Sequence, residues 1–294
     1  MTSLLIFTRE YSLITNTITT IFGIFGNSLN ILTFTKLKAF ENNQCIFYLL
    51  AESIVNLIAV IFYFIIRILI TQYGSDFTPY ITTWCRLKIM IVQTILLFPL
   101  FVVCFAAMDQ YLATNSCIVL RQMSTLKLAR ALLFSSLGFS LMHSIGFGLF
   151  FYARSPVDCG LLHPILMRYY SYFFYPILCG FLPLFISGLC SLLAYRNVRR
   201  IIRRQLPIVR RRLDRQLTKF VLLRVTFHIL LLAPFIIYRA YAIHIHINPN
   251  DSFRLATDRL LLAIFGSFFN LNYTVIVNWE IFRTLFSFCV SLCR

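Results

Sequence analysis

Few side chains in this sequence could do chemistry, and most of them are cysteines or isolated charges. The nine cysteines are scattered, with no CxxC pair and no cluster with histidine, so no metal site is expected. The sequence also lacks HExxH, GxSxG and any histidine-rich di-metal pattern, which are motifs of catalytic sites. Glu52 and Arg224 are the main charges inside long apolar stretches. We therefore expect a protein that is not an enzyme and uses no cofactor.

The composition indicates the solvent in which the protein folds. Hydrophobic residues make up 59% of the 294 residues, and charged residues only 13%. A water-soluble domain of this length would need more charged and polar residues to cover its surface. A protein surrounded by lipid does not, because its surface can be apolar. The apolar runs are long and continuous, which favours membrane helices over a β-barrel. The net charge of +17 suits a basic cytoplasmic face, and no nucleic-acid partner is expected.

The apolar stretches predict an all-α, seven-transmembrane helix bundle. The expected spans are residues 11–36, 44–71, 87–112, 129–152, 169–195, 217–243 and 255–278. The alternative is six spans with one re-entrant segment. We expect residues 1–10 to form an extracellular N-terminus without a cleavable signal, and residues 11–278 to form the transmembrane domain. Residues 279–294 are expected to form a cytoplasmic membrane-surface helix and tail.

Lysine and arginine in the loops predict the orientation. Ten of them lie between Arg196 and Lys219, in the connection between spans 5 and 6. Short loops rich in these residues stay in the cytoplasm, so the N-terminus is expected outside and the C-terminus inside. This basic segment could also attract anionic lipid.

Two cysteines fall on the face expected to be oxidising. Cys85 stands at the outer mouth of span 3, and Cys159 lies in the loop after span 4. They could form a disulfide that holds this loop to the helix, or they could remain free thiols. Asp109, the first residue of the run Asp109-Gln110-Tyr111, lies 24 residues beyond Cys85, or ~36 Å along a helix, which is one membrane crossing.

In order and spacing these residues resemble the rhodopsin-like family of G-protein-coupled receptors. Asp109-Gln110-Tyr111 resembles the Asp-Arg-Tyr motif, with Gln in place of Arg. Further similarities are Gly26-Asn27 in span 1, Glu52 to Asn56 in span 2, Pro183 in span 5, Pro234 in span 6, and Asn270 with Asn272 in span 7. Phe282-Arg283 resembles the start of the membrane-surface helix. The chain departs from the family by lacking the Trp of span 4, the Cys-Trp before Pro234 and the Pro of the span-7 motif.

The resemblance implies a receptor in the plasma membrane that binds an extracellular ligand and activates a heterotrimeric G protein. The sequence is most similar to the invertebrate receptors related to those for short amidated neuropeptides. In the family an acid at the base of span 6, here Asp214, pairs with the span-3 Arg. Gln110 is neutral, so a weaker inner latch and raised basal activity are expected. Asp214 could instead form a helix-surface pair with Arg211 or Arg215. The resemblance also gives the basic segment from Arg196 to Lys219 the role of docking the G protein, with topology and lipid attraction as the alternative. The alternatives are a transporter or channel, and a receptor-like protein without G-protein coupling.

Other candidate residues have both a functional and a structural interpretation. Glu52 could be a polar packing contact or have an ion or activation role, because Asn56 cannot supply the carboxylate of the family's sodium pocket. Pro99, Pro183 and Pro234 could mark hinges or static bends. His143 and His228 are expected to be polar contacts of the core.

The remaining candidates concern the ligand and covalent modification. Ligand contacts are expected in the outer half of the bundle, at Arg67, Gln93, Tyr175, Tyr238, Arg239 and Asp258. Arg67 could instead reach lipid headgroups. Cys289 and Cys293 are candidate S-palmitoylation sites, and Asn250 begins an outward glycosylation sequon.

Overall fold

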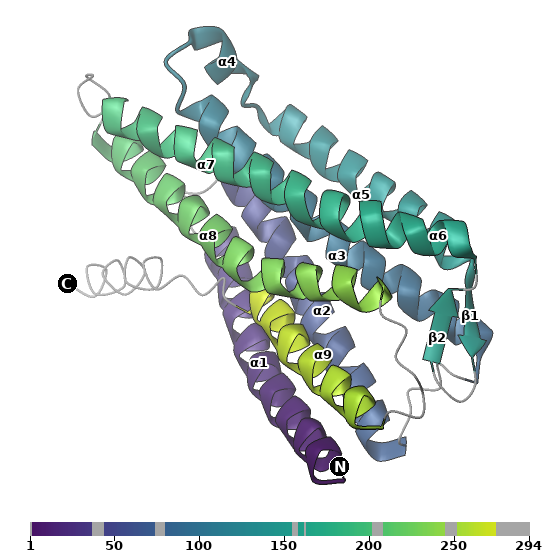
Figure 1. Ribbon diagram of the computed structural model, residues 1–294. Helices are drawn as coiled ribbons and strands as arrows, with labels where there is room; N and C mark the ends of the chain where they lie inside the picture. The colour runs from purple at the N-terminus through teal and green to yellow at the C-terminus, as the bar shows by residue number, and fades with distance from the viewer. Residues whose placement is uncertain are drawn as a thin grey trace, which may run out of the picture.

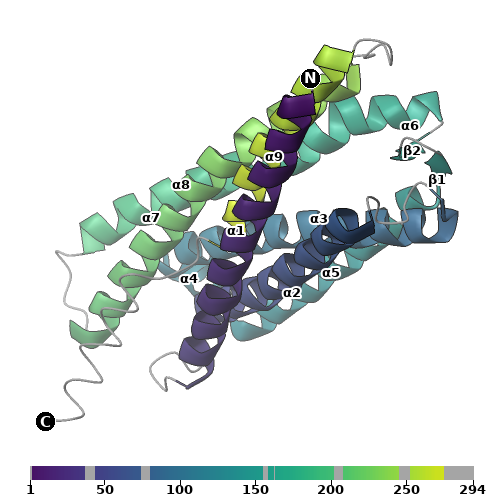
Figure 2. The ribbon, with the colours of Figure 1, turned by 90° about the horizontal axis from the view of Figure 1, so that it is seen from below.

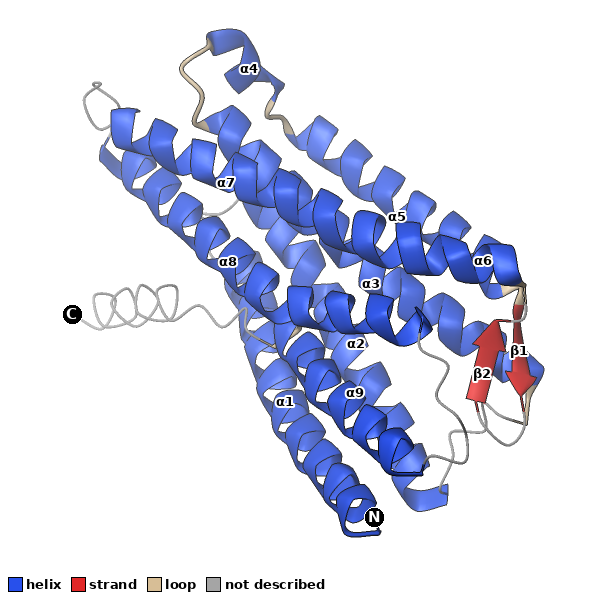
Figure 3. Cartoon of the chain, viewed as in Figure 1, coloured by secondary structure: helices blue, strands red, loops and turns tan. Residues whose placement is uncertain are grey.

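The computed structural model describes residues 2–36, 44–73, 80–154, 158–161, 163–201, 208–244 and 252–274. The helices are α1 (Thr2–Lys36), α2 (Gln44–Tyr73), α3 (Thr82–Ala113), α4 (Ile118–Met123), α5 (Leu126–Gly148), α6 (Pro164–Tyr169), the π-helix η2 (Tyr170–Phe181), α7 (Leu182–Ile201), α8 (Ile208–His244) and α9 (Ser252–Asn272). Two short antiparallel strands, β1 (Phe151–Arg154) and β2 (Asp158–Leu161), form a hairpin (Figure 3).

The predicted all-α membrane bundle is confirmed as a fold class. Among the described residues, six helical segments are long and apolar enough to cross a membrane. They are Ser3–Lys36, Gln44–Ile70, Thr82–Ala113, Leu126–Gly148, Pro164–Arg199 and Val221–Ala242. Helix α9 has 21 residues and packs beside α1 and α8, but it is not one of these six. Asp258, Arg259 and Asn270 interrupt its apolar run.

Helix α3 is the centre of the bundle, since it packs against α2, α5, α7 and α8. Its buried residues include Leu97, Leu100 and Val102, whose relative exposure is 2% or less. The β1–β2 hairpin lies at one end of the bundle, and α4 lies at the opposite end (Figures 1 and 2). The first of these is called the hairpin end below, and the second the α4 end.

The helices differ from the predicted spans mainly at their ends. Helix α1 begins at Thr2 instead of residue 11, and α5 ends at Gly148 because the chain enters the hairpin at Phe151. The predicted fifth span is continuous from α6 through η2 into α7, with a π-helical stretch in the half nearer the hairpin. Pro176 lies inside this stretch and has no backbone N–H to donate, which suits a break from the α-helical pattern.

Candidate functional site

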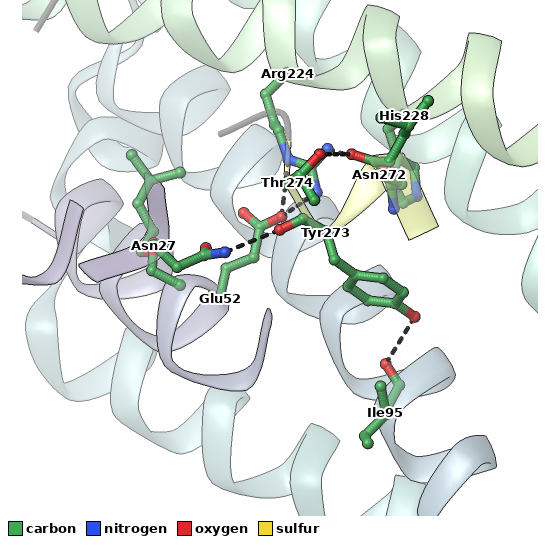
Figure 4. A network of polar contacts seen from close by, with 11 residues as sticks. Asn27, Glu52, Ile95, Arg224, His228, Asn272, Tyr273 and Thr274 are labelled. Atoms are coloured by element: carbon green, nitrogen blue, oxygen red, sulfur yellow. Dashed lines mark hydrogen bonds and ion pairs between the residues drawn. The ribbon is translucent and has the colours of Figure 1, made fainter. Parts of the chain in front are cut away.

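The interior of the bundle contains an ion pair between α2 and α8. Arg224 donates hydrogen bonds from Nε and Nη2 to Oε1 of Glu52, at 2.8 and 2.5 Å (Figure 4). Glu52 is 1% exposed and Arg224 is 4% exposed. The two helices do not pack extensively against each other, so the long arginine side chain spans the space between them. Each charge neutralises the other in a place where water cannot do so.

Helix α9 joins this pair through Asn272. Nη1 of Arg224 donates to Oδ1 of Asn272 at 2.8 Å, and Nδ1 of His228 lies 3.1 Å from the same oxygen. A carbonyl oxygen can only accept, so the histidine carries its proton on Nδ1. Glu52, Arg224, Asn272 and His228 are called the central network below. The network connects α2, α8 and α9 at one level of the bundle.

The end of α9 is also held by α1 and α3. Nδ2 of Asn27 donates to the carbonyl oxygens of Gly23 and Tyr273, at 2.8 and 2.9 Å. The hydroxyl of Tyr273 donates to the carbonyl of Ile95 on α3, at 3.4 Å (Figure 4). One turn nearer the start of α9, Asn270 donates to Oδ1 of Asn16 at 2.7 Å. Polar groups of α1, α3 and α8 therefore contact the segment from Asn270 to Tyr273.

The predicted Asp109-Gln110-Tyr111 motif lies at the α4 end of α3. Asp109 and Gln110 are buried, and Tyr111 is half-buried. Asp109 accepts a hydrogen bond from Ser124 at 2.6 Å, and Oε1 of Gln110 accepts one from Thr218 of α8 at 3.1 Å. Asp214 lies in α8 one turn before Thr218, but its side chain is outside the described residues. A neutral hydrogen bond thus joins α3 to α8 at this end.

At the hairpin end the predicted disulfide is confirmed. Cys85 at the start of α3 is bonded to Cys159 of β2, with 5.6 Å between their Cα atoms. Arg86 donates from Nε to the carbonyl of Phe151 at 3.1 Å and lies over the ring of Tyr152, 4.8 Å from its centroid. The disulfide and Arg86 both hold the hairpin against the beginning of α3.

Five of the six predicted ligand residues form polar contacts between helices near this end. Gln93 donates to the hydroxyl of Tyr170 at 2.5 Å, joining α3 to η2. Tyr238 donates to the Asp258 carboxylate at 2.5 Å, joining α8 to α9. Arg239 donates to the hydroxyl of Tyr175 at 3.2 Å, joining α8 to η2. Arg67 is half-buried on α2 and is not part of these three contacts.

The other predicted residues occupy different environments. Asn56 is fully buried, and neither its side-chain oxygen nor its nitrogen has a hydrogen-bond partner within the described part of the chain. His143 bonds the hydroxyl of Tyr169 at 2.9 Å and stacks on Phe174, as expected of a core contact. Pro99, Pro183 and Pro234 lie inside helices α3, α7 and α8. Asn250, Phe282-Arg283, Cys289 and Cys293 lie outside the described residues.

Sequence reasoning identified Glu52 and Arg224 separately and did not pair them. The signal was present, because an unpaired charge inside a membrane helix is costly and these two were the main ones, with opposite sign. No comparable pattern in the sequence indicated that Ser124 would bond Asp109 or that Thr218 would bond Gln110. Comparison of the chain with protein-family models and with curated proteins finds no match to either.

Proposed function

We propose that this chain is a seven-transmembrane receptor of the plasma membrane that binds an extracellular ligand and activates a heterotrimeric G protein. In this proposal α9 is the seventh span, the hairpin end is extracellular, and the α4 end is cytoplasmic. The resemblance of the motifs to rhodopsin-like receptors supports this orientation, as does the basic segment from Arg196 to Lys219, which includes the end of α7 and the start of α8. Short amidated peptides are the ligand class to test first.

The observation that carries the proposal is the buried pair of Glu52 and Arg224. A receptor needs two arrangements of its helices and contacts that differ between them. The pair holds α8 to α2, and Asn272 holds α8 to α9. An outward movement of α8 at the α4 end would change both contacts, since Arg224 lies between that end and Pro234. In this proposal the central network controls such a movement.

The contact of Gln110 with Thr218 supports a second, weaker restraint at the α4 end. Both groups are neutral, so this hydrogen bond is weaker than an arginine–carboxylate pair. We expect measurable basal activity for this reason. An arginine at position 110 could pair with Asp214 and reduce that activity.

Nucleotide exchange on purified G proteins tests the proposal directly. The full-length chain in lipid nanodiscs should accelerate exchange without ligand, and Gln110→Arg should reduce this rate. Gln122→Arg is the matched control, because Gln122 is exposed at the same end and the change adds the same charge. Amidated peptides should then raise the rate of the unmodified chain. Unchanged basal exchange in Gln110→Arg, together with no peptide response, would refute the proposal.

A transporter is the second candidate, and one observation favours it. Charged residues buried in a helical bundle often mark an ion or substrate pathway, and Glu52 with Arg224 fits that description. Uptake into vesicles that contain the purified chain separates the two functions. A receptor gives exchange without uptake, whereas a transporter gives uptake that is lost in Glu52→Gln. Peptide binding with neither exchange nor uptake would indicate a receptor-like protein without coupling.

A further inference from the structure

Ser124 forms hydrogen bonds with two helices at the α4 end of the bundle. It follows the last residue of α4, and its hydroxyl donates to Oδ1 of Asp109 on α3 at 2.6 Å. Its carbonyl oxygen accepts a hydrogen bond from Gln44 at the start of α2, at 3.2 Å. One residue of the α3–α5 connection therefore fixes that connection to two helices. One of its partners belongs to the Asp109-Gln110-Tyr111 motif.

The chain around Ser124 is suited to recognition by an enzyme that modifies serine. Ser124 and Thr125 have extended backbones, with φ and ψ of −70° and 92° and of −130° and 150°. Arg121, three residues before Ser124, is exposed, as are Gln122 and Met123. Helix α4 has six residues and none of them is buried, so it can unwind locally at little cost. An acidic subsite of a kinase could then pair with Arg121.

We propose that Ser124 is a phosphorylation site for a basophilic serine/threonine kinase, and that phosphate there releases the α3–α5 connection from Asp109. The proposal rests on the proposed function in one respect, the cytoplasmic position of the α4 end. In the transfer, Oγ of Ser124 forms a bond to the γ-phosphorus of a nucleoside triphosphate, and the bond from that phosphorus to the bridging oxygen breaks. Nucleoside diphosphate leaves, and the hydroxyl proton passes to the kinase's catalytic base.

Phosphate at this position reverses the contact with Asp109. The phosphoester oxygen has no hydrogen to donate, and the group carries about −1.5 to −2 charges at neutral pH. It would lie within hydrogen-bonding distance of a carboxylate that is 7% exposed, so the two groups repel each other. Arg121 and Lys127 are exposed three residues before and after Ser124, so both offer the phosphate a charge opposite to that of Asp109.

Thr125 provides a control with the opposite expected effect. Its Oγ1 caps the first turn of α5 by accepting from the backbone N–H of Leu128 at 3.3 Å. Negative charge at a helix N-terminus is favourable. An acidic residue at position 125 should therefore strengthen the start of α5 and leave the contact of Ser124 with Asp109 in place.

The first experiment tests modification itself. The purified full-length chain is incubated with ATP and a basophilic kinase, and its peptides are sequenced by mass spectrometry. We expect phosphate on Ser124, its loss in Ser124→Ala, and a strong reduction in Arg121→Ala. Arg130→Ala should leave it unchanged, because Arg130 is exposed but lies after the acceptor. Phosphate only at other residues, or full modification of Arg121→Ala, would overturn the proposal.

The second experiment measures the structural consequence with a spin label on Cys117. This free cysteine is exposed and lies just before α4; Cys190, Cys289 and Cys293 are replaced by serine in this background. Ser124→Asp should increase the mobility of the label, and Thr125→Asp should not. In a background with Asp109→Asn the effect of Ser124→Asp should disappear, because the repulsion is gone. Equal mobility in Ser124→Asp and the unmodified chain would overturn the proposal.

Neither measurement requires a G protein or a ligand. Phosphorylation with loop release, but no nucleotide exchange under any condition, would therefore remove the proposed function alone. Nucleotide exchange with no modification at Ser124 would remove the phosphorylation proposal alone.

Discussion

Arg224 of α8 directs two nitrogen donors, Nε and Nη2, at the same carboxylate oxygen of Glu52 on α2. Both side chains are at most 4% exposed, so neither charge is compensated by bulk water. A buried charge left without its partner is strongly destabilising, whereas a buried pair is often no more stabilising than apolar residues of similar size. This asymmetry allows the pair to be tested through variants of one partner and of both.

Removal of one charge should destabilise the bundle more than removal of both. We expect Glu52→Leu and Arg224→Met each to lower the free energy of unfolding by about 3–5 kcal/mol. The double variant should recover most of this loss, since no unpaired charge remains. Thermal unfolding in detergent measures the effect. Glu10→Leu is the control, because Glu10 is an exposed acid on α1 and its loss should change little.

Additive losses in the double variant would contradict this prediction. They would show that Glu52 and Arg224 contribute to stability independently.

Thr218 should restrain α8 through its hydrogen bond to Gln110. Thr218→Val keeps the shape of the side chain and removes the hydroxyl donor. Loss of one neutral hydrogen bond is worth about 1 kcal/mol, or roughly a fivefold change in a two-state equilibrium. If the chain is a receptor, basal nucleotide exchange should rise by about that factor at most. Thr226→Val is the control, because this exposed threonine donates to the carbonyl of Leu222 in its own helix.

The disulfide should contribute to stability as one unit. Cys85→Ser, Cys159→Ser and the double variant should each lose about 2–5 kcal/mol, with no further loss in the double. The bond closes a long segment, since its two cysteines are 74 positions apart, and it holds the hairpin to α3. Cys117→Ser should have little effect, because that thiol is free and exposed. Unfolding curves with and without a reducing agent provide the measurement, and a reductant should affect only chains that keep both cysteines.

Features that depend on local composition could be predicted from the sequence. The apolar runs predict the six apolar helices, and most of the helix ends fall within a few residues of the predicted positions. Length and hydropathy decide which segments fit a membrane, and both can be read from the sequence. The pairing of Cys85 with Cys159 was predicted as one of two possibilities, because both cysteines fall on one face of the bundle.

Features that depend on helix rotation could not be predicted. Glu52 and Arg224 are 172 residues apart, and their contact depends on which face each helix turns inward. Tyr238 and Arg239 are consecutive and were both expected to face a ligand, yet they bond different helices, α9 and η2. The hairpin and the π-helical stretch also escaped prediction, since short strands and local changes in helical pitch have no strong sequence pattern.

The packing of α1 against α2 should depend on the absence of a side chain at Gly23. A Cβ built at this position would lie 2.9 Å from Cγ2 of Val60 and 3.1 Å from Cγ2 of Thr274. Val60 is β-branched and has little rotamer freedom, so it cannot move aside cheaply. The carbonyl of Gly23 also accepts from Asn27, which holds the end of α9 through Tyr273.

We therefore expect Gly23→Ala to lower the free energy of unfolding by about 1–3 kcal/mol, the usual cost of overpacking. Gly138→Ala is the matched control, because a Cβ at Gly138 of α5 meets no atom within 4 Å. Alanine also favours a helix over glycine by about 1 kcal/mol, so Gly138→Ala should be neutral or stabilising. Val60→Ala should restore stability to Gly23→Ala by making room for the new methyl group. Equal stability of Gly23→Ala and Gly138→Ala would show that α1 can shift away from α2 without loss.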